Sequence, residues 1–170
     1  MKFELISIPK TEIQQFKTDI QEAFQLGFED HFGKTDRTVL PEKDIDKSLN
    51  AKGAAAYKAV AGGEFVGGAV VVIDDKTQHN HLDLLYVKRG CQSKGIGHRI
   101  WTELERLYPE TIEWETCTPY FDRRNVHFYV NVCGFQIVEF FNEKHPMPDE
   151  PDDFIGDGNE GMFLFKKKMK

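Results

Sequence analysis

Hydrophobic and polar positions in the first part of the chain predict a strand followed by a helix. Residues Phe3–Ile8 alternate weakly, as is typical of a strand. After Pro9 the period lengthens, and apolar residues recur on one helical face at Ile13, Phe16, Ile20 and Phe24. Pro9 suits the first turn of this helix, and we expect the helix to end near Gly27.

The polar segment Glu29–Asn50 is expected to be a loop that contains one short helix, around Asp44–Leu49. A run of strands should follow, because short apolar segments are separated here by turn-forming residues. The predicted strands are Ala54–Ala61, Phe65–Ile73 and Asn80–Val87.

The second half of the chain continues with alternating helices and strands. A strongly amphipathic helix is predicted over Ile96–Leu107, and Pro109 would end it. The remaining elements are a strand at Ile112–Thr116, a helix at Arg123–Val132 closed by Gly134, and strands at Phe135–Phe141 and Met162–Lys168. Because hairpin-linked and helix-linked strands occur together, we expect a mixed α/β sheet and exclude a purely parallel one.

Length and composition narrow the class of protein. A chain of 170 residues predicts one domain over residues 1–170. The net charge of −6 excludes a generally basic nucleic-acid-coating protein, although it allows a local anion site. Three cysteines without a C-x-x-C pair favour free thiols in a reducing compartment. No secretory signal or membrane span is visible, so we expect a cytoplasmic protein without a membrane partner.

The segment Gln92–Arg99, with the sequence Q-S-K-G-I-G-H-R, carries the most informative pattern. Gly95 and Gly97 allow the backbone to approach a ligand closely, and the helix that they open has unpaired N–H groups at its positive end. Such an end favours an anion, most naturally a pyrophosphate. From Lys88 to Arg99 there are four Lys or Arg residues and no acidic residue. The segment is therefore predicted to bind an anion.

Two common phosphate-binding patterns do not fit this segment. A Walker A loop requires Lys and then Ser or Thr after its second glycine, but Ile96 and Gly97 occupy those places. A dinucleotide-binding fingerprint requires a third glycine where Ile100 stands. Each pattern lacks a residue that its chemistry needs.

The pattern Q-x-x-G-x-G, at the start of a helix and after a strand ending at Val87, resembles motif A of the GNAT superfamily of N-acetyltransferases. The segment Arg123–Phe135 is similar to the family's later helix and its Gly-Phe exit into the next strand. The order of strands agrees over roughly Phe3–Phe141. The resemblance implies an α/β (α+β) fold: a mixed, mostly antiparallel sheet with a splayed central strand pair, flanked by helices.

The resemblance also implies acetyl-CoA as the cofactor. In the family, the motif A loop wraps the pyrophosphate, and pantetheine lies in the gap between the splayed strands. The Val87 N–H would then stabilise the oxyanion, while Arg99 and Lys88 would meet the outer phosphates by charge. For Asn125, cofactor contact competes with a helix-capping role. The implied cofactor-binding residues are Leu85, Tyr86, Val87, Gln92, Ser93, Lys94, Gly95, Ile96, Gly97, His98, Arg99 and Asn125.

A general base is expected because a lysine-type ammonium has a pKa of about 10.4, so most of the acceptor arrives protonated. Strand alternation predicts His81, Asp83, Leu85 and Val87 on one face. Either His81 or Asp83 would serve as the base, since His81 lies near the place where some family members carry a glutamate. The competing interpretation is that both are polar residues on a half-exposed strand face.

In the family, the leaving thiolate usually takes its proton from a tyrosine four residues before the glycine of Gly-Phe. Here that position is Val130, and Tyr129 lies five residues before Gly134. In an α-helix one residue corresponds to a rotation of about 100°. Tyr129 is therefore the best candidate for the acid, with a core-facing orientation as the alternative.

Other patterns are weaker. His79 and His81 have a spacing that metals use, but beyond Asp83 no further Cys, His or carboxylate cluster accompanies them, so no metal is expected. The segment Asp152–Glu160 lacks the spacing of a calcium loop. The acidic segment Glu143–Glu160 is predicted to be a solvated loop, with an acidic lip for cationic acceptors as the alternative. Cys117 and Cys133 are predicted to be small buried hydrophobes, and Cys91 a more reactive thiol without a partner.

Together these features predict an acetyl-CoA-dependent N-acetyltransferase that transfers the acetyl group directly to a primary amine of a small molecule or peptide. No covalent intermediate is expected, because the sequence shows no Ser-His or Cys-His signature. Two alternatives stay open: a non-catalytic acyl-CoA-binding module of the same fold, and a nucleotide-binding protein that uses the loop for ATP. We expect no nucleic-acid partner, and a homodimer is possible because such folds often dimerise.

Overall fold

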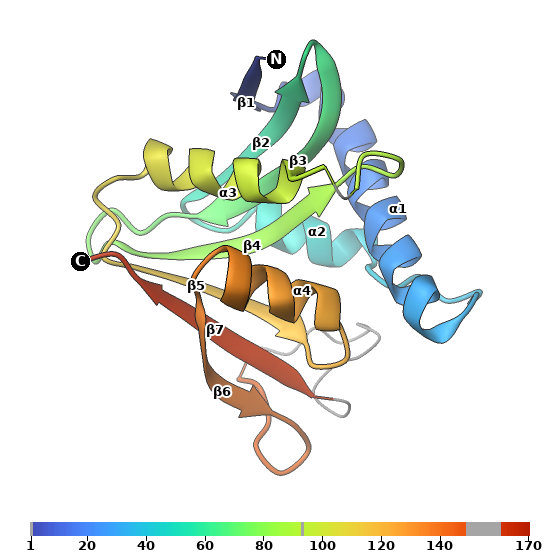
Figure 1. Ribbon diagram of the computed structural model, residues 1–170, viewed down its shortest axis with the longest axis vertical. Coiled ribbons are helices and arrows are strands. Elements are labelled where there is room, and N and C mark those ends of the chain that lie inside the picture. Colours follow the sequence, from blue (N-terminus) through green and yellow to red (C-terminus); the bar gives the residue numbers. More distant parts are fainter. Residues whose placement is uncertain (1, 93, 149–160) are drawn as a thin grey trace.

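A computed structural model of the protein describes residues 2–92, 94–148 and 161–170. The described chain forms a seven-stranded sheet in the order β1-β2-β3-β4-β5-β7-β6 (Figure 1). The strands are β1 (Phe3–Ser7), β2 (Ala54–Ala61), β3 (Glu64–Val72), β4 (His79–Val87), β5 (Glu113–Pro119), β6 (Gln136–Phe141) and β7 (Met162–Lys168). The helices are α1 (Ile13–Phe32), α2 (Glu42–Leu49), α3 (Ile96–Leu107) and α4 (Arg123–His127), with a 3-10 turn at Lys10–Glu12 and a π-helical segment at Phe128–Val132.

The sheet is mixed and mostly antiparallel, which confirms the predicted fold. Neighbouring strands from β1 to β4 run antiparallel, as do β5, β7 and β6. The two halves join through β4 and β5, which run parallel. This parallel join is made over only three residues of each strand, His79–His81 and Glu113–Glu115. Beyond them the two strands separate, as Figure 1 shows, so the expected splayed central pair is present.

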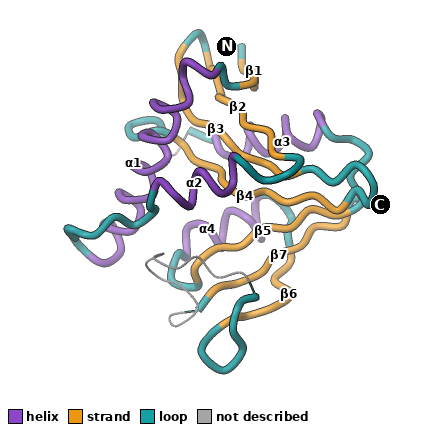
Figure 2. The backbone as a smooth tube through the Cα atoms, turned by 180° about the vertical axis from the view of Figure 1, so that it is seen from behind, coloured by secondary structure: helices purple, strands orange, loops and turns teal. Residues whose placement is uncertain are grey.

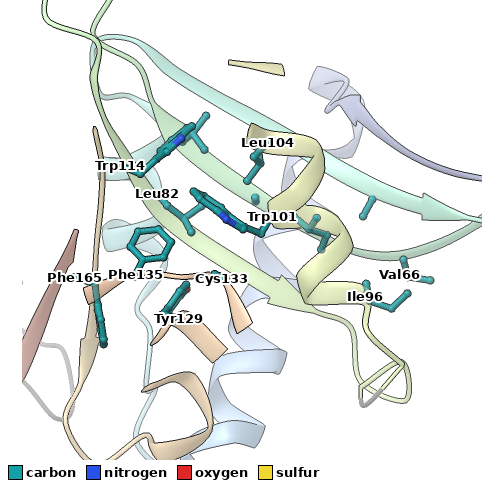
Figure 3. Packing of buried hydrophobic residues seen from close by; sticks show 14 of the residues in the cluster. Val66, Leu82, Ile96, Trp101, Leu104, Trp114, Tyr129, Cys133, Phe135 and Phe165 are labelled. Carbon is teal, nitrogen blue, oxygen red and sulfur yellow. The ribbon is translucent and has the colours of Figure 1, made fainter. Parts of the chain in front are cut away.

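Helices cover the two faces of the sheet differently. On one face α3 and α4 pack over a core that includes Trp101, Trp114 and Phe135, with Trp101 and Trp114 in edge-to-face contact at 5.2 Å (Figure 3). On the other face α1 and α2 pack through Phe16, Ile20 and Ile45 against β3 and β4. Figure 2, which is the view from behind, shows α1 and α2 in front of the sheet and α3 and α4 on its far side. Two separate apolar clusters therefore hold the sheet between helical layers.

The first long helix does not end near Gly27 as predicted. It continues to Phe32, and Gly33 follows it with a φ of 88°. Gly27 lies inside the helix. The rings of Phe28 and Phe32, which follow it, contact the ring of Phe121 at ring-centre distances of 5.9 and 4.7 Å. This tertiary contact outweighs the modest cost of a helical glycine. The extra turns carry α1 toward the segment that follows β5.

A β-bulge in β4 overturns the predicted alternation of its side chains. The ladder with β3 pairs Val71 with Leu82 and Val70 with Leu84, so Asp83 is the extra residue. Leu82 belongs to the core under α3, whereas Leu84 and Tyr86 belong to the core under α1. His81 therefore does not share a face with Leu85 and Val87, because the bulge shifts the phase of the strand by one residue.

Candidate functional site

A cavity of about 1300 Å³ opens where β4 and β5 separate. The second half of α1, parts of α2, the first turn of α3 and α4 surround it, while β4 contributes His81 and residues 83–87. The cavity thus joins the gap between the two strands to the space beside α1. It brings most of the sequence-predicted residues to one place.

The gap exposes two backbone donors of β4. The Lys88 N–H donates to the Val66 carbonyl on β3 at 2.8 Å. Since successive backbone groups of a strand point to opposite edges, the N–H groups of Leu85 and Val87 point away from β3. The ladder to β5 stops at His81, so neither N–H group takes part in it. The predicted cofactor segment Leu85–Val87 therefore offers two N–H groups to the gap.

The N-terminus of α3 forms the other end of the cavity. Gly95 precedes the helix with a left-handed φ of 73°, and no side chain of the described residues caps it. The first turn contains no acidic residue, so its N–H groups and positive dipole end are open to an anion. Gln92 braces the preceding loop, since its Oε1 accepts from the Gly90 N–H at 2.9 Å. Ser93, also predicted for this site, lies outside the described residues.

The predicted loop residues separate into those that border the cavity and those that do not. Gln92, Gly95, Ile96, Gly97 and His98 border it, as do Leu85, Tyr86, Val87 and Asn125. The Arg99 guanidinium instead lies over the ring of Phe3 at 4.5 Å, and Lys88 lies over Phe65 at 4.9 Å. Lys94 is not among the lining residues. Phosphate contacts by these three cations stay predictions.

His81 and Asp83 meet at the base of the gap. His81 Nδ1 lies 2.6 Å from Asp83 Oδ1, and His81 Nε2 lies 3.7 Å from Glu115 Oε1. Burial lowers the pKa of His81, but the Asp83 carboxylate and the Cys117 side chain raise it, to about 10. The imidazole is therefore mainly protonated at neutral pH, and its conjugate acid is about as strong as the ammonium form of an alkylamine.

Two residues of β5 join this site that the sequence analysis did not identify. Glu115 is the ladder partner of His81, and Cys117 follows it on the same strand face. Both border the cavity. The signal for them was the alternating segment E-W-E-T-C, but it becomes informative only once β5 is known to lie beside β4. Cys117 packs against the apolar cluster of Phe141, Met162 and Leu164, but it is only half-buried and also borders the cavity. Cys133 is buried as predicted.

Tyr129 lies in a π-helical turn, which accommodates the one-residue offset. The Cys133 N–H donates to the Phe128 carbonyl at 2.9 Å, and the Phe135 N–H donates to the Tyr129 carbonyl at 2.8 Å. A π turn contains one more residue than an α turn. Tyr129, five positions before Gly134, borders the cavity although it also belongs to the buried core.

The Tyr129 ring is held at the boundary between core and cavity. It packs against Phe135 and Phe165 with ring-centre distances of 5.6 and 5.5 Å, as Figure 3 shows, and it also borders the cavity. Burial raises the pKa of its hydroxyl well above the usual value. The hydroxyl is therefore a protonated hydrogen-bond donor at neutral pH.

The start of α4 is capped by Asp122, so the expected capping role of Asn125 was wrong. The Asp122 carboxylate accepts from the Asn125 N–H at 3.0 Å. The Asn125 side chain instead reaches β5 and donates to Thr118 Oγ1 at 3.3 Å. Asn125 is thereby placed on the cavity wall between α4 and β5.

The remaining predicted patterns add no site. Within residues 2–92, 94–148 and 161–170, no group of three or more His, Cys, Asp or Glu side chains is arranged to hold a metal ion. The segment Asp152–Glu160 and most of the acidic segment ending at Glu160 lie outside the described residues. In the part of the chain that the structure describes, no helix is long and apolar enough to cross a membrane.

Comparison with known proteins identifies the family. The family model of the acetyltransferase (GNAT) family matches residues 15–135, which include both segments that carry the resemblance. The chain belongs to the GNAT acetyltransferase family. It is also 42% identical over 167 residues to the uncharacterized protein YrkN of Bacillus subtilis strain 168, covering 95% of this chain and 90% of that protein.

Solved GNAT structures share the fold. The ribosomal-protein-S18-alanine N-acetyltransferase of Escherichia coli superposes with a TM-score of 0.70 at 12% identity, covering 99% of this chain and 95% of that chain. Spermidine N-acetyltransferase of Vibrio cholerae, in complex with CoA and spermine, superposes with a TM-score of 0.70 at 10% identity, covering 98% of this chain and 95% of that one. These GNAT neighbours therefore include proteins named for a peptide amine and for a small-molecule amine.

Proposed function

We propose that this protein is an N-acetyltransferase that moves the acetyl group of acetyl-CoA directly to a primary amine of a small molecule or peptide. The observation that carries the proposal is the open gap between β4 and β5, which leads from the N-terminus of α3 to the His81–Asp83 pair. An elongated cofactor with an anionic end and a reactive end fits this arrangement.

The two ends of the cavity suit the two ends of acetyl-CoA. The first turn of α3, opened by Gly95, would bind the pyrophosphate through its N–H groups. The Val87 N–H would pair either with pantetheine or with the thioester oxygen, and the family resemblance assigns it the second role. His81 lies six residues before Val87, about 20 Å in an extended strand. The Leu85 N–H is closer to the base and is therefore the better-placed oxyanion donor.

The acceptor amine would approach from the side of Asp83 and Glu115. Both carboxylates border the cavity, so they would attract an ammonium ion. The neutral form of His81 is a base matched in strength to an alkylamine, because Asp83 raises its pKa. The neutral fraction of His81, which is small at neutral pH and grows as the pH rises, would take the proton from the amine, and the Tyr129 hydroxyl would donate to the leaving sulfur.

Thermal unfolding with acetyl-CoA, CoA, ATP-Mg²⁺ or buffer tests the cofactor site. A ligand at one hundred times its Kd stabilises the folded state by about 2.7 kcal/mol. The matched variants are Gly97→Glu and Gly97→Gln, because a side chain at this position meets the Phe128 ring at 3.1 Å in both. Only Gly97→Glu adds a negative charge at the anion site, so it should lose more of the stabilisation by CoA.

Three results would separate the proposed function from its alternatives. Stabilisation by acetyl-CoA together with acetylation of at least one amine in a panel of polyamines, lysine peptides and N-terminal alanine peptides supports the transferase. Tight binding of CoA without transfer to any of these amines favours a non-catalytic acyl-CoA-binding module. Stabilisation by ATP-Mg²⁺ alone contradicts the proposal and favours nucleotide binding.

A further inference from the structure

Cys117 occupies a position that the direct-transfer mechanism does not use. It lies on β5, two residues after Glu115, which is paired with His81 in the short parallel ladder. Residues two apart on a strand share a face, so Cys117 lies on the same face as the His81 partner. The thiol is free and half-buried, and it borders the same cavity as His81 and Asp83.

The three side chains are connected through the imidazole. Asp83 Oδ1 lies 2.6 Å from His81 Nδ1. Cys117 lies two residues after Glu115, whose Oε1 is 3.7 Å from His81 Nε2, and its side chain contributes to the raised pKa of His81. A carboxylate bonded to a histidine fixes the orientation of the imidazole, which can then exchange a proton with a thiol within reach. Carboxylate, imidazole and thiol are together the groups that activate cysteine nucleophiles in enzymes.

The thiol also lies beside the path of the acetyl group. The ladder between β4 and β5 ends at His81 and Glu115, so Cys117 stands on β5 where the gap begins. Leu85, whose N–H points into the gap, lies on the opposite wall two residues after Asp83. An acetyl group held by the Leu85 N–H would therefore have the Cys117 sulfur on the facing strand.

We propose that Cys117 is an acyl acceptor: when acetyl-CoA is bound and the cavity contains no amine, the acetyl group moves to the Cys117 sulfur. The inference rests on the proposed function for the binding of acetyl-CoA. It does not depend on which amine is the natural acceptor. With an amine present, direct transfer and release from acetyl-Cys117 would yield the same product.

The reaction is a thioester exchange that balances without a further reactant. The Cys117 thiolate attacks the carbonyl carbon of acetyl-CoA, and a new S–C bond forms. The bond from that carbon to the CoA sulfur breaks, and the leaving thiolate takes the proton carried by the His81 imidazolium. The products are S-acetyl-Cys117, CoA with a free thiol, and neutral His81. An amine that later attacks this thioester returns the proton to His81 and the thiolate to Cys117.

The test is the intact mass of the full chain after incubation with acetyl-CoA alone, followed by peptide mapping. The wild type should gain one acetyl group at Cys117, and neutral hydroxylamine should remove it because the bond is a thioester. Cys117→Ala should gain none of this label. Cys91→Ala is the matched control, because Cys91 is the other half-buried thiol that borders the cavity, and it should be labelled at Cys117 like the wild type. Asp83→Asn should slow the labelling by about tenfold or more.

Thermal unfolding of the same samples distinguishes the two ways to fail. If acetyl-CoA stabilises the wild type and Cys117→Ala alike, both are folded and bind the cofactor. No hydroxylamine-sensitive acetyl group at Cys117 under those conditions overturns this inference and leaves the proposed function intact. Equal labelling of Cys91 and Cys117 overturns it as well, since that result shows unselective thiol chemistry. Absence of any stabilisation by acetyl-CoA contradicts the proposed function itself.

Discussion

The backbone N–H of Cys133 donates to the carbonyl of Phe128, five residues earlier, at 2.9 Å. This bond defines the π turn that contains Tyr129, and the turn absorbs the extra residue between Tyr129 and Gly134. Tyr129 lies one residue earlier than the tyrosine of the family pattern, yet it borders the cavity. π turns inside helices are often found at functional sites.

Tyr129→Phe tests the proposed role of the hydroxyl. The ring contacts with Phe135 and Phe165 should persist, so stability should change little, whereas loss of a proton donor should lower kcat roughly 100-fold. KM for acetyl-CoA should stay close to the wild-type value. Steady-state kinetics with any accepted amine measures both constants. Tyr57→Phe, which removes a hydroxyl on β2 that bonds to Tyr108, is the control, and equal kcat values for the two variants would contradict the assignment.

The pH dependence of kcat/KM tests the base. Asp83 raises the pKa of His81, so in the wild type the neutral base becomes more abundant as the pH rises toward about 10. Asp83→Asn removes the carboxylate and should shift the rising limb of the profile to lower pH. The pKa of the amine is the same in both experiments, so the shift reports on the enzyme.

Glu113→Gln is the matched control for this profile. Glu113 lies 3.7 Å from His79 rather than beside His81, so its removal should leave the rising limb in place. Loss of activity in Asp83→Asn at every pH, without a shift of the limb, would instead identify Asp83 as the base itself. A limb that shifts equally in Glu113→Gln would contradict the specific effect of Asp83 on His81.

Thr116→Val tests what holds the edge of the gap. The buried Thr116 hydroxyl donates to the Leu82 carbonyl at 2.8 Å, just beyond the last ladder pair of β4 and β5. Valine keeps the shape but leaves this carbonyl without the bond, which should lower the free energy of unfolding by about 1–3 kcal/mol. Urea unfolding measures the change. Thr116→Ser keeps the hydroxyl and should lose less, so equal losses would show that the bond contributes nothing.

Asp122→Ala tests the support of the helix that carries Tyr129. Removing the cap that accepts from the Asn125 N–H should lower the free energy of unfolding by about 1 kcal/mol. Asp122→Asn keeps an acceptor oxygen and should be close to the wild type in denaturant unfolding. If both variants lose the same amount, the charge at the helix start matters and the capping bond does not.

The sequence by itself determined the features that depend on local pattern. The helical period of Ile96–Leu107, the glycines of the loop before it and the turn residues between strands predicted the element order and the anion-binding end of the cavity. The predicted element order was confirmed, because periodicity and glycine geometry act within a few residues of chain, whereas anion binding by the loop stays a prediction. The end of α1 was misplaced, because the contact of Phe32 with Phe121 joins distant parts of the chain.

The arrangement of the reactive groups was decided by tertiary structure. Alternation cannot reveal the bulge at Asp83, which exists because β4 pairs with β3 in a shifted register. Likewise, the contact of the Tyr129 ring with Phe165 joins distant parts of the chain. Glu115 and Cys117 reach His81 only because β5 pairs parallel to β4 for three residues and then leaves it. Local sequence specifies elements, whereas register between distant strands specifies which side chains meet.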